Sequence, residues 1–192
     1  MLETNRLIIR NFKDDEKDIE ALYKIMSEIE INKYLPWFPI NNKAEAFDFY
    51  KERILPKYQE NNGYYFSICL KSNNYPIGYI TVNNEKSHDF GYGLKKEFWR
   101  QEITTEAARK VIEFLIQADW KYITATHDIN NVASGKVLKK LGMKYKYTYK
   151  EQWQPKDILV TFRMYQLNFD GKNRVYEEYW NMYDDHFVEN IN

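Results

Sequence analysis

A serine and an asparagine stand three residues apart in the segment ATHDINNVASGKVLKKLGM, which covers residues 125–143. Residues at this spacing share one face of a helix, so Asn131 and Ser134 would lie together at a helix start. There the Ser134 hydroxyl could donate a proton to a leaving group, and Asn131 could hydrogen-bond an amide-bearing ligand. A local role is also open, in which Asn130 or Asn131 caps the helix and Ser134 is merely exposed.

A second candidate site is the junction over 94–105, where a glycine-flanked strand end, FGYGL, leads through a loop into a long helix. A helix N-terminus presents unpaired N–H groups and the positive end of the helix dipole, which suit a phosphate. Lys95 and Arg100 add positive charge beside it. Gly91 and Gly93 indicate a bulge or a close backbone approach. The alternative is an ordinary strand–helix turn with a solvated basic face.

Hydrophobic periodicity predicts the elements that would position these residues. Apolar residues at helical spacing predict helices over 15–28, 43–60, 103–118, 133–141 and 171–190. Alternating or β-rich stretches predict strands over 7–10, 64–70, 77–82, 88–94, 122–126, 143–150 and 158–167. Pro56 should kink or end the second helix early. Short connections between the early strands imply antiparallel neighbours, and one strand–helix–strand crossover follows, so we expect an α+β fold with a mixed sheet.

The composition excludes several classes of protein. The 192 residues make one domain, or one domain with an appendage, and 44% hydrophobic against 29% charged residues is a globular balance. Lys plus Arg and Asp plus Glu are 28 each, so no basic excess indicates nucleic-acid binding. One cysteine and three separated histidines offer no zinc-type spacing. Without a signal-peptide or membrane-spanning stretch, we expect a cytoplasmic protein with no metal and no membrane partner.

Four stretches together resemble the GCN5-related N-acetyltransferase (GNAT) family, in particular its ribosomal-protein N-terminal acetyltransferase branch. They are, in chain order, LETNRLIIR, PIGYITV followed by DFGYGL, FWRQEITTEAARKVIEFLI and NVASGKVLKKLGM. The resemblance runs from residue 1 to about residue 167 in the family's order. It implies an acetyltransferase domain over 1–170. The helical tail over 171–192 lies outside it, and we expect that tail to dock on the domain or on a partner subunit.

The resemblance implies a mostly antiparallel sheet, flanked by helices, whose two central parallel strands splay apart after a bulge. The pantetheine arm of acetyl-CoA would lie in that gap, bonded to Asn131 and to the backbone of Tyr92 and Leu94. The pyrophosphate would lie on a loop and helix start formed by Arg100, Gln101, Glu102, Ile103, Thr104 and Thr105. Ser134 would protonate the departing thiolate, a role that other members give to a tyrosine where this chain has Leu138.

Two loop residues depart from the family pattern, which normally has a glycine at Glu102 and a glycine or alanine at Thr104. A glycine lets the backbone approach the phosphates closely. The Glu102 carboxylate would oppose a pyrophosphate at the same helix N-terminus unless its side chain turns away, with Arg100 and Lys95 as offsetting charges. The departure leaves open an alternative function, a non-catalytic or weakly active acyl-CoA-binding or regulatory domain on the same fold.

A general base is needed because the acceptor amine must be neutral to attack the thioester. Asp89 stands where this branch often has a glutamate, and His127, at the end of the neighbouring strand, is the alternative. Deprotonation by water is also open. The leading prediction is direct transfer of acetyl from acetyl-CoA to a primary amine of a small molecule or peptide, by a monomer or homodimer.

Overall fold

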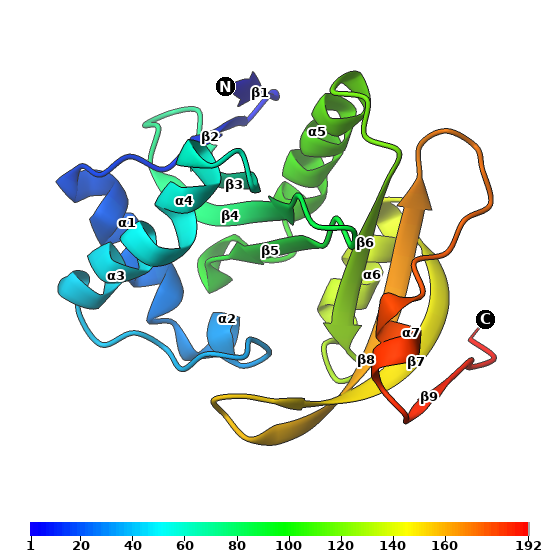
Figure 1. Cartoon of the computed structure of the whole chain (residues 1–192). Coiled ribbons are helices and arrows are strands. Elements are labelled where there is room, and N and C mark those ends of the chain that lie inside the picture. The colour runs from blue at the N-terminus through cyan, green and yellow to red at the C-terminus, as the bar shows by residue number, and fades with distance from the viewer. Residues whose placement is uncertain (192) are drawn as a thin grey trace.

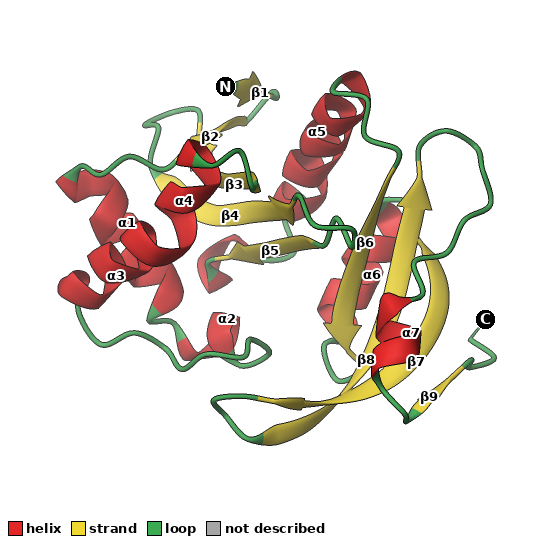
Figure 2. Ribbon diagram, viewed as in Figure 1, coloured by secondary structure: helices red, strands yellow, loops and turns green. Residues whose placement is uncertain are grey.

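The computed structural model describes residues 1–191 and contains two antiparallel sheets that diverge from each other (Figures 1 and 2). The first sheet has the order β1-β2-β3-β4-β5 and the second the order β6-β8-β7-β9. The strands are β1 (Leu2–Glu3), β2 (Leu7–Asn11), β3 (Gly63–Leu70), β4 (Pro76–Asn83), β5 (Phe90–Leu94), β6 (Tyr122–Asp128), β7 (Lys144–Trp153), β8 (Ile158–Asn168) and β9 (His186–Phe187). The helices are α1 (Glu16–Met26), α2 (Ile29–Asn32), α3 (Lys43–Phe49), the π-helical turn η1 (Tyr50–Ile54), α4 (Leu55–Gln59), the 3₁₀ turn η2 (Lys96–Phe98), α5 (Ile103–Gln117), α6 (Val132–Lys140) and α7 (Glu178–Met182).

The two sheets meet where β5 and β6 begin. Asp89, just before β5, forms a parallel bridge with Thr124 of β6, and the Thr124 N–H donates to the His88 carbonyl at 3.3 Å. The Thr124 hydroxyl also donates to the Ser87 carbonyl at 2.8 Å. On its other edge β6 pairs with β8 along its whole length, and β5 pairs with β4, so beyond this bridge β5 and β6 diverge (Figure 1). The expected pair of adjacent, parallel and diverging strands is therefore confirmed.

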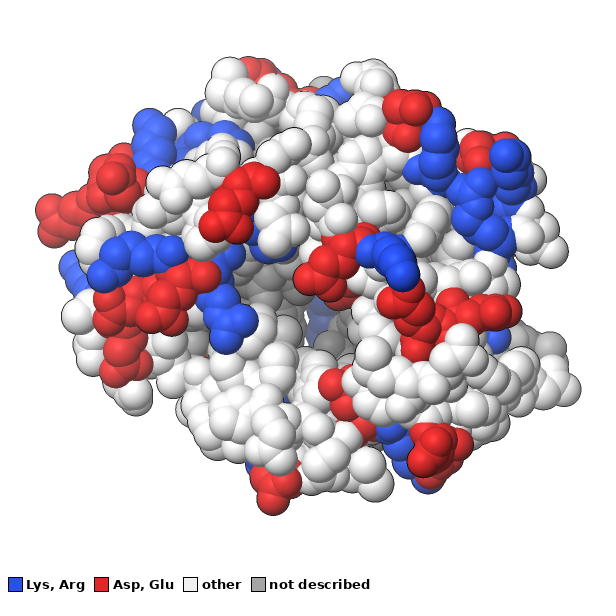
Figure 3. Space-filling model, viewed as in Figure 1, with Lys and Arg blue, Asp and Glu red and all other residues white. Residues whose placement is uncertain are grey.

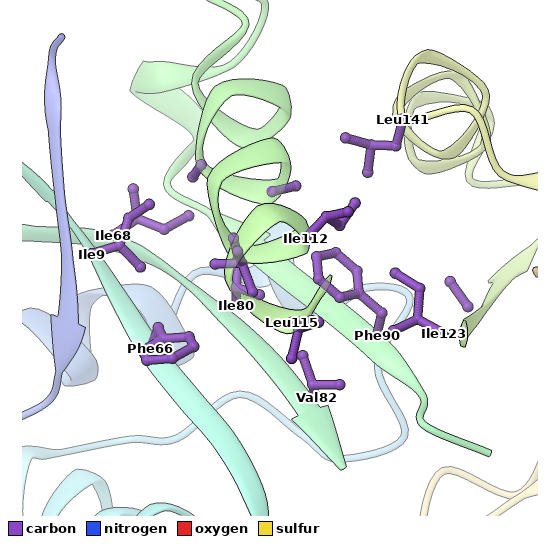
Figure 4. Close-up of a cluster of buried hydrophobic side chains, with 14 of the residues drawn as sticks. Ile9, Phe66, Ile68, Ile80, Val82, Phe90, Ile112, Leu115, Ile123 and Leu141 are labelled. Carbon is purple, nitrogen blue, oxygen red and sulfur yellow. The ribbon is translucent and has the colours of Figure 1, made fainter. Parts of the chain in front are cut away.

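The main core lies between the sheets and the pair α5 and α6. Alternating residues of each strand point to this side, among them Ile80 of β4 and Phe90 of β5, and they pack on Ile112 and Leu115 of α5 (Figure 4). Ile123 of β6 belongs to the same cluster, so one core joins both sheets. Because strand residues alternate between faces, Asp89, Gly91 and Gly93 point away from this core.

The opposite face of the first sheet is covered by α1, α3 and α4, which enclose a second cluster including Leu22, Ile54 and Tyr79. Asn42 caps α3 by accepting the Glu45 N–H at 3.0 Å, as its spacing predicts. Pro56 does not end the helix early: it lies in the first turn of α4, directly after the π-helical turn η1, and the helix runs on to Gln59. Proline has no N–H for the helical ladder, and a widened turn accommodates the loss.

Tight backbone approach, and no bulge, explains the glycines of β5. The register between β4 and β5 is continuous from Phe90 to Leu94, so the expected bulge is absent from this strand. A Cβ atom on Gly93 would lie 2.5 Å from Cε1 of Tyr79, which is closer than side chains tolerate. Gly93 thus lets the Tyr79 side chain approach the β5 backbone closely.

The predicted helix over the tail is wrong for most of its length. The structure has only the five-residue helix α7 there, and β9 adds to the second sheet by pairing with β7. The apolar residues of the tail instead pack on Tyr147 and Tyr149 of β7, in a cluster that includes Tyr176, Tyr179, Trp180 and Tyr183. A helix this short gains little stability on its own, so packing against β7 decides the path of the chain.

The described residues hold neither a membrane-spanning helix nor a group of metal ligands. Within residues 1–191 no helix combines the length and apolarity that a membrane crossing requires. Among the same residues, no three His, Cys, Asp or Glu side chains are grouped to hold a metal ion.

Candidate active site

The loop before α5 brings the six predicted pyrophosphate-binding residues to one place. Arg100 and Glu102 both adopt left-handed backbone conformations, with φ of 61° and 60°, and Glu102 is the N-cap residue directly before α5. The N–H groups of Ile103, Thr104 and Thr105 form the first helical turn, where no intrahelical acceptor exists. The loop therefore presents a row of backbone donors at the positive end of a fifteen-residue helix.

The Glu102 side chain makes no cap hydrogen bond to these backbone donors. Its carboxylate forms an ion pair with the Lys140 ammonium at the end of α6, and this hydrogen bond holds the pKa of the Glu102 carboxyl below its usual range. The left-handed backbone at Glu102 explains why the family pattern has a glycine there, since a side chain adds strain in this conformation. The charge expected to oppose a phosphate is thus offset by a cation that the sequence analysis did not single out.

Asn131 is the residue that caps α6. Its Oδ1 accepts the Ser134 N–H at 3.2 Å, while Asn130 donates its side-chain amide to Asp128 at 2.9 Å. The cap fixes Ser134 in the first turn of α6, with its side chain only partly exposed. Asn131 and Ser134 therefore lie together, as the three-residue spacing predicts.

The side chain of Tyr92, from the first sheet, contacts Ser134. The Tyr92 hydroxyl lies 2.9 Å from Ser134 Oγ and 3.0 Å from the Ser134 carbonyl oxygen. Tyr92 belongs to β5 and Ser134 to α6, which follows β6. The contact therefore spans the gap between the diverging strands β5 and β6, which we call the parting. Burial raises the pKa of the Tyr92 hydroxyl, so it remains protonated near neutral pH. Sequence reasoning placed Tyr92 here through its backbone and missed the contact of its side chain.

Asp89 lies at the same parting, on the face away from α5 and α6. The residue is half-buried, but its Oδ1 is shielded from solvent and has no hydrogen-bond partner. Burial raises the pKa of the Asp89 carboxyl from 3.8 to about 7; Glu85 contributes in the same direction and Lys57 opposes it. An unpartnered carboxyl of this kind can accept a proton near neutral pH.

His127 does not join Asp89. Its ring lies under α6, where a Cβ on Gly135 would come within 2.8 Å of it, and its Nδ1 is 2.8 Å from the Asp128 carbonyl oxygen. Burial lowers the pKa of the His127 imidazole, so the ring is neutral at neutral pH. Side chains alternate between the two faces of β6, so His127 points to the same, core-facing side as Ile123. The structure thus separates the two candidate bases.

On the Asp89 side, the surface is hollowed between the helices α1–α4 and the second sheet (Figure 3). The lower rim of this hollow is closed by contacts between the two halves. The Lys156 ammonium, in the β7–β8 turn, donates to the Asn32 carbonyl at 2.7 Å, and the Tyr34 hydroxyl donates to the Asn130 carbonyl at 3.1 Å. The parting of the strands therefore has a helix-covered side with phosphate-type donors and an opposite, hollowed side with a carboxyl group.

The chain matches a family model and a relative that are both described as acetyltransferases. The family model described as "Acetyltransferase (GNAT) domain" matches residues 6–144. The chain is 26% identical over 155 residues to an uncharacterized N-acetyltransferase, YnaD, of Bacillus subtilis strain 168, covering 78% of this chain and 86% of YnaD.

Two solved structures have a similar fold. The microcin C7 self-immunity acetyltransferase MccE, in complex with acetyl-CoA and AMP, superimposes with a TM-score of 0.74 at 18% identity, covering 86% of this chain and 94% of MccE. RimL, the ribosomal L7/L12 α-N-protein acetyltransferase in complex with coenzyme A, superimposes with a TM-score of 0.72 at 19% identity, covering 88% and 97%.

Proposed function

Because the chain belongs to the GNAT family of acetyltransferases, we propose that it moves an acetyl group from acetyl-CoA to a primary amine by direct attack. The acceptor is the amine of a small molecule or of a peptide. Two proteins of similar fold support this range, since MccE is a self-immunity enzyme and RimL acetylates the N-terminus of a ribosomal protein.

The covered side of the parting suits acetyl-CoA. The amides of Ile103, Thr104 and Thr105 are donors for the pyrophosphate. The free edge of β5, from Tyr92 to Leu94, offers backbone groups to the pantetheine arm. The Oδ1 atom of Asn131 is occupied as a helix cap, so its amide NH₂ is the group left to bond that arm.

The observation that carries the proposal is the placing of a proton donor and a proton acceptor on either side of one parting. The Ser134–Tyr92 pair lies at its α6 side, and Asp89 lies at its hollowed side. In the transfer, the amine nitrogen bonds to the thioester carbonyl carbon, and the carbon–sulfur bond breaks with its electron pair on sulfur. Ser134 Oγ gives its proton to that sulfur, and Asp89 takes the proton that the new amide nitrogen loses. Proton exchange with solvent then returns a proton to Ser134 and removes one from Asp89.

Tyr92 supports the donor, and β5 supports the carbonyl oxygen. The Tyr92 hydroxyl stays protonated and donates to the Ser134 carbonyl, and by turning its O–H it can donate to Ser134 Oγ as the serine proton moves to sulfur. A backbone N–H of β5 near Tyr92–Leu94 is the group available to bond the oxygen on which negative charge develops. The raised pKa of the Asp89 carboxyl suits the acceptor role, because a base is most effective when its pKa lies near the working pH.

A panel of amines tests the proposal. Purified protein is incubated with acetyl-CoA and single amines, comprising a polyamine, an amino sugar and peptides with free α-amino groups. We expect release of free CoA thiol with an equal amount of acetylated amine for at least one class, and loss of transfer in Asp89→Asn. Saturable binding of acetyl-CoA with no transfer to any member of the panel would favour a binding or regulatory domain instead.

A further inference from the structure

The C-terminal tail crosses the hollowed side of the parting and is fastened to both sheets. Glu178 of α7 pairs with Lys86, in the β4–β5 loop, at 3.1 Å. On the second sheet, the Tyr147 hydroxyl donates to the Tyr176 carbonyl at 2.7 Å. Further along, Glu189 pairs with Arg163 of β8 at 2.5 Å. Figure 1 shows α7 in front of β7 and β8. The tail is therefore held at several points as it crosses this side.

The tail carries aromatic rings within electrostatic range of Asp89. Tyr149 of β7 is buried between two tail tyrosines, Tyr179 at 5.3 Å and Tyr183 at 4.9 Å between ring centroids, both nearly parallel to it. Burial raises the pKa of the Tyr179 hydroxyl, and the nearby Asp89 charge raises it further. Asp89 also raises the pKa of Tyr149. Glu178, the neighbour of Tyr179 in α7, pairs at 3.1 Å with Lys86, only three residues before Asp89.

We propose that the tail forms one wall of the acceptor side and that Tyr179 is a positioning residue that excludes water from the Asp89 carboxyl. The inference rests on the proposed role of Asp89 as the base. A wall of this kind adds no reacting group. It keeps the carboxyl unsolvated and ready to accept a proton, and it narrows the route by which an amine reaches the parting.

Other charged and titratable groups around Asp89 also affect the pKa of its carboxyl. Glu85, in the β4–β5 loop, disfavours the charged carboxylate, and Lys57 of α4 favours it. Tyr149 of β7 and Tyr179 of α7 lie within electrostatic range of Asp89, and both stay neutral because burial raises the pKa of their hydroxyls. Water exclusion by the two rings is thus the contribution that a change at Tyr179 removes.

The test measures the titration of Asp89 directly, so it needs no acceptor. Carboxyl carbon NMR of ¹³C-aspartate-labelled protein follows the Asp89 signal, assigned with Asp89→Asn, in the wild type and in three variants. Tyr179→Ala removes the ring, Tyr179→Phe keeps it, and Met182→Ala alters an exposed residue of the same helix, 64% accessible, as a matched control. Acetyl-CoA-induced thermal stabilisation, measured for each variant, reports whether the domain is intact.

We expect the Asp89 midpoint to stay near that of the wild type in Tyr179→Phe and Met182→Ala. In Tyr179→Ala it should fall by at least about one pH unit toward the ordinary value of about 3.9, because water reaches the carboxyl. An unchanged midpoint in Tyr179→Ala overturns the inference. The proposed function fails separately, when Asp89→Asn transfers acetyl to an amine as fast as the wild type.

Discussion

At the residue scale, the contact between Ser134 and Tyr92 makes a prediction about proton donation. Ser134→Ala should lower kcat by about 10²–10⁴-fold, the usual effect of losing a positioned acid, with acetyl-CoA affinity nearly unchanged. Tyr92→Phe keeps the packed ring and should lower kcat by a smaller factor. Because Tyr92 acts through Ser134, the double variant should be no slower than Ser134→Ala alone. Rates measured where chemistry is limiting check this, and fully additive losses would show that the two residues act independently.

The ion pair between Glu102 and Lys140 makes a second prediction at this scale. The Lys140 ammonium already offsets the charge of the Glu102 carboxylate, and exposed ion pairs contribute little free energy. Glu102→Gly should therefore change acetyl-CoA affinity by less than about fivefold. Lys140→Gln should weaken binding more in the wild-type background than in Glu102→Gly, because it unmasks the carboxylate. Calorimetric titration at low salt measures all four proteins. A tightening of tenfold or more in Glu102→Gly alone would mean that the carboxylate still faces the phosphates.

Sequence could predict only the local part of this site. Asn131 and Ser134, or the loop residues around Glu102, are neighbours along the chain, so spacing and turn chemistry place them together. Tyr92 and Ser134 are 42 residues apart, and Glu102 and Lys140 are 38 apart, and no periodicity links them. Such contacts depend on how the two sheets and α6 are packed, which is a property of the whole core.

At the element scale, the two glycines of β5 make a matched pair of probes. A Cβ on Gly93 would meet the buried Tyr79 ring at 2.5 Å, whereas one on Gly91 would meet only the Thr81 methyl at 3.1 Å. Gly93→Ala should therefore cost about 1–3 kcal/mol of stability, as overpacking usually does, and shift β5 enough to weaken acetyl-CoA binding. Gly91→Ala should have a clearly smaller effect on both. Denaturant unfolding and thermal shift with acetyl-CoA give the comparison, and equal effects would contradict it.

The elements themselves follow from the sequence where an apolar pattern meets a clear end signal. The long helix α5 and the cap at Asn42 were both predictable from local chemistry. The tail was not, because its aromatic residues have helical spacing but are used to cover Tyr147 and Tyr149. Whether such an aromatic segment forms a helix or covers a sheet depends on which apolar surface the rest of the fold leaves exposed.

At the scale of the whole molecule, Asp89 links activity to stability. Its pKa is about 7 in the folded chain and 3.8 ordinarily, so the folded state holds this proton more tightly than the unfolded state. The associated stability is fully present below about pH 4 and is lost as pH rises through 7, for a total of about 4 kcal/mol. Asp89→Asn removes this dependence.

Asp89→Asn should therefore unfold at higher urea concentration than the wild type at pH 8, and the difference should shrink toward zero near pH 4. Other groups titrate equally in both proteins and cancel in the comparison. A stability difference that does not vary with pH would mean that Asp89 titrates at its ordinary value and is not poised to act as a base near neutral pH.

A crystal structure with bound acetyl-CoA tests the central claim most directly. We predict that the pyrophosphate lies on the amides of Ile103–Thr105 and that the pantetheine arm runs along β5. The thioester should then reach the parting of the strands, with its sulfur toward Ser134 Oγ and its carbonyl carbon open to the Asp89 side. A coenzyme bound elsewhere on the surface, with the parting between β5 and β6 left empty, would contradict the account.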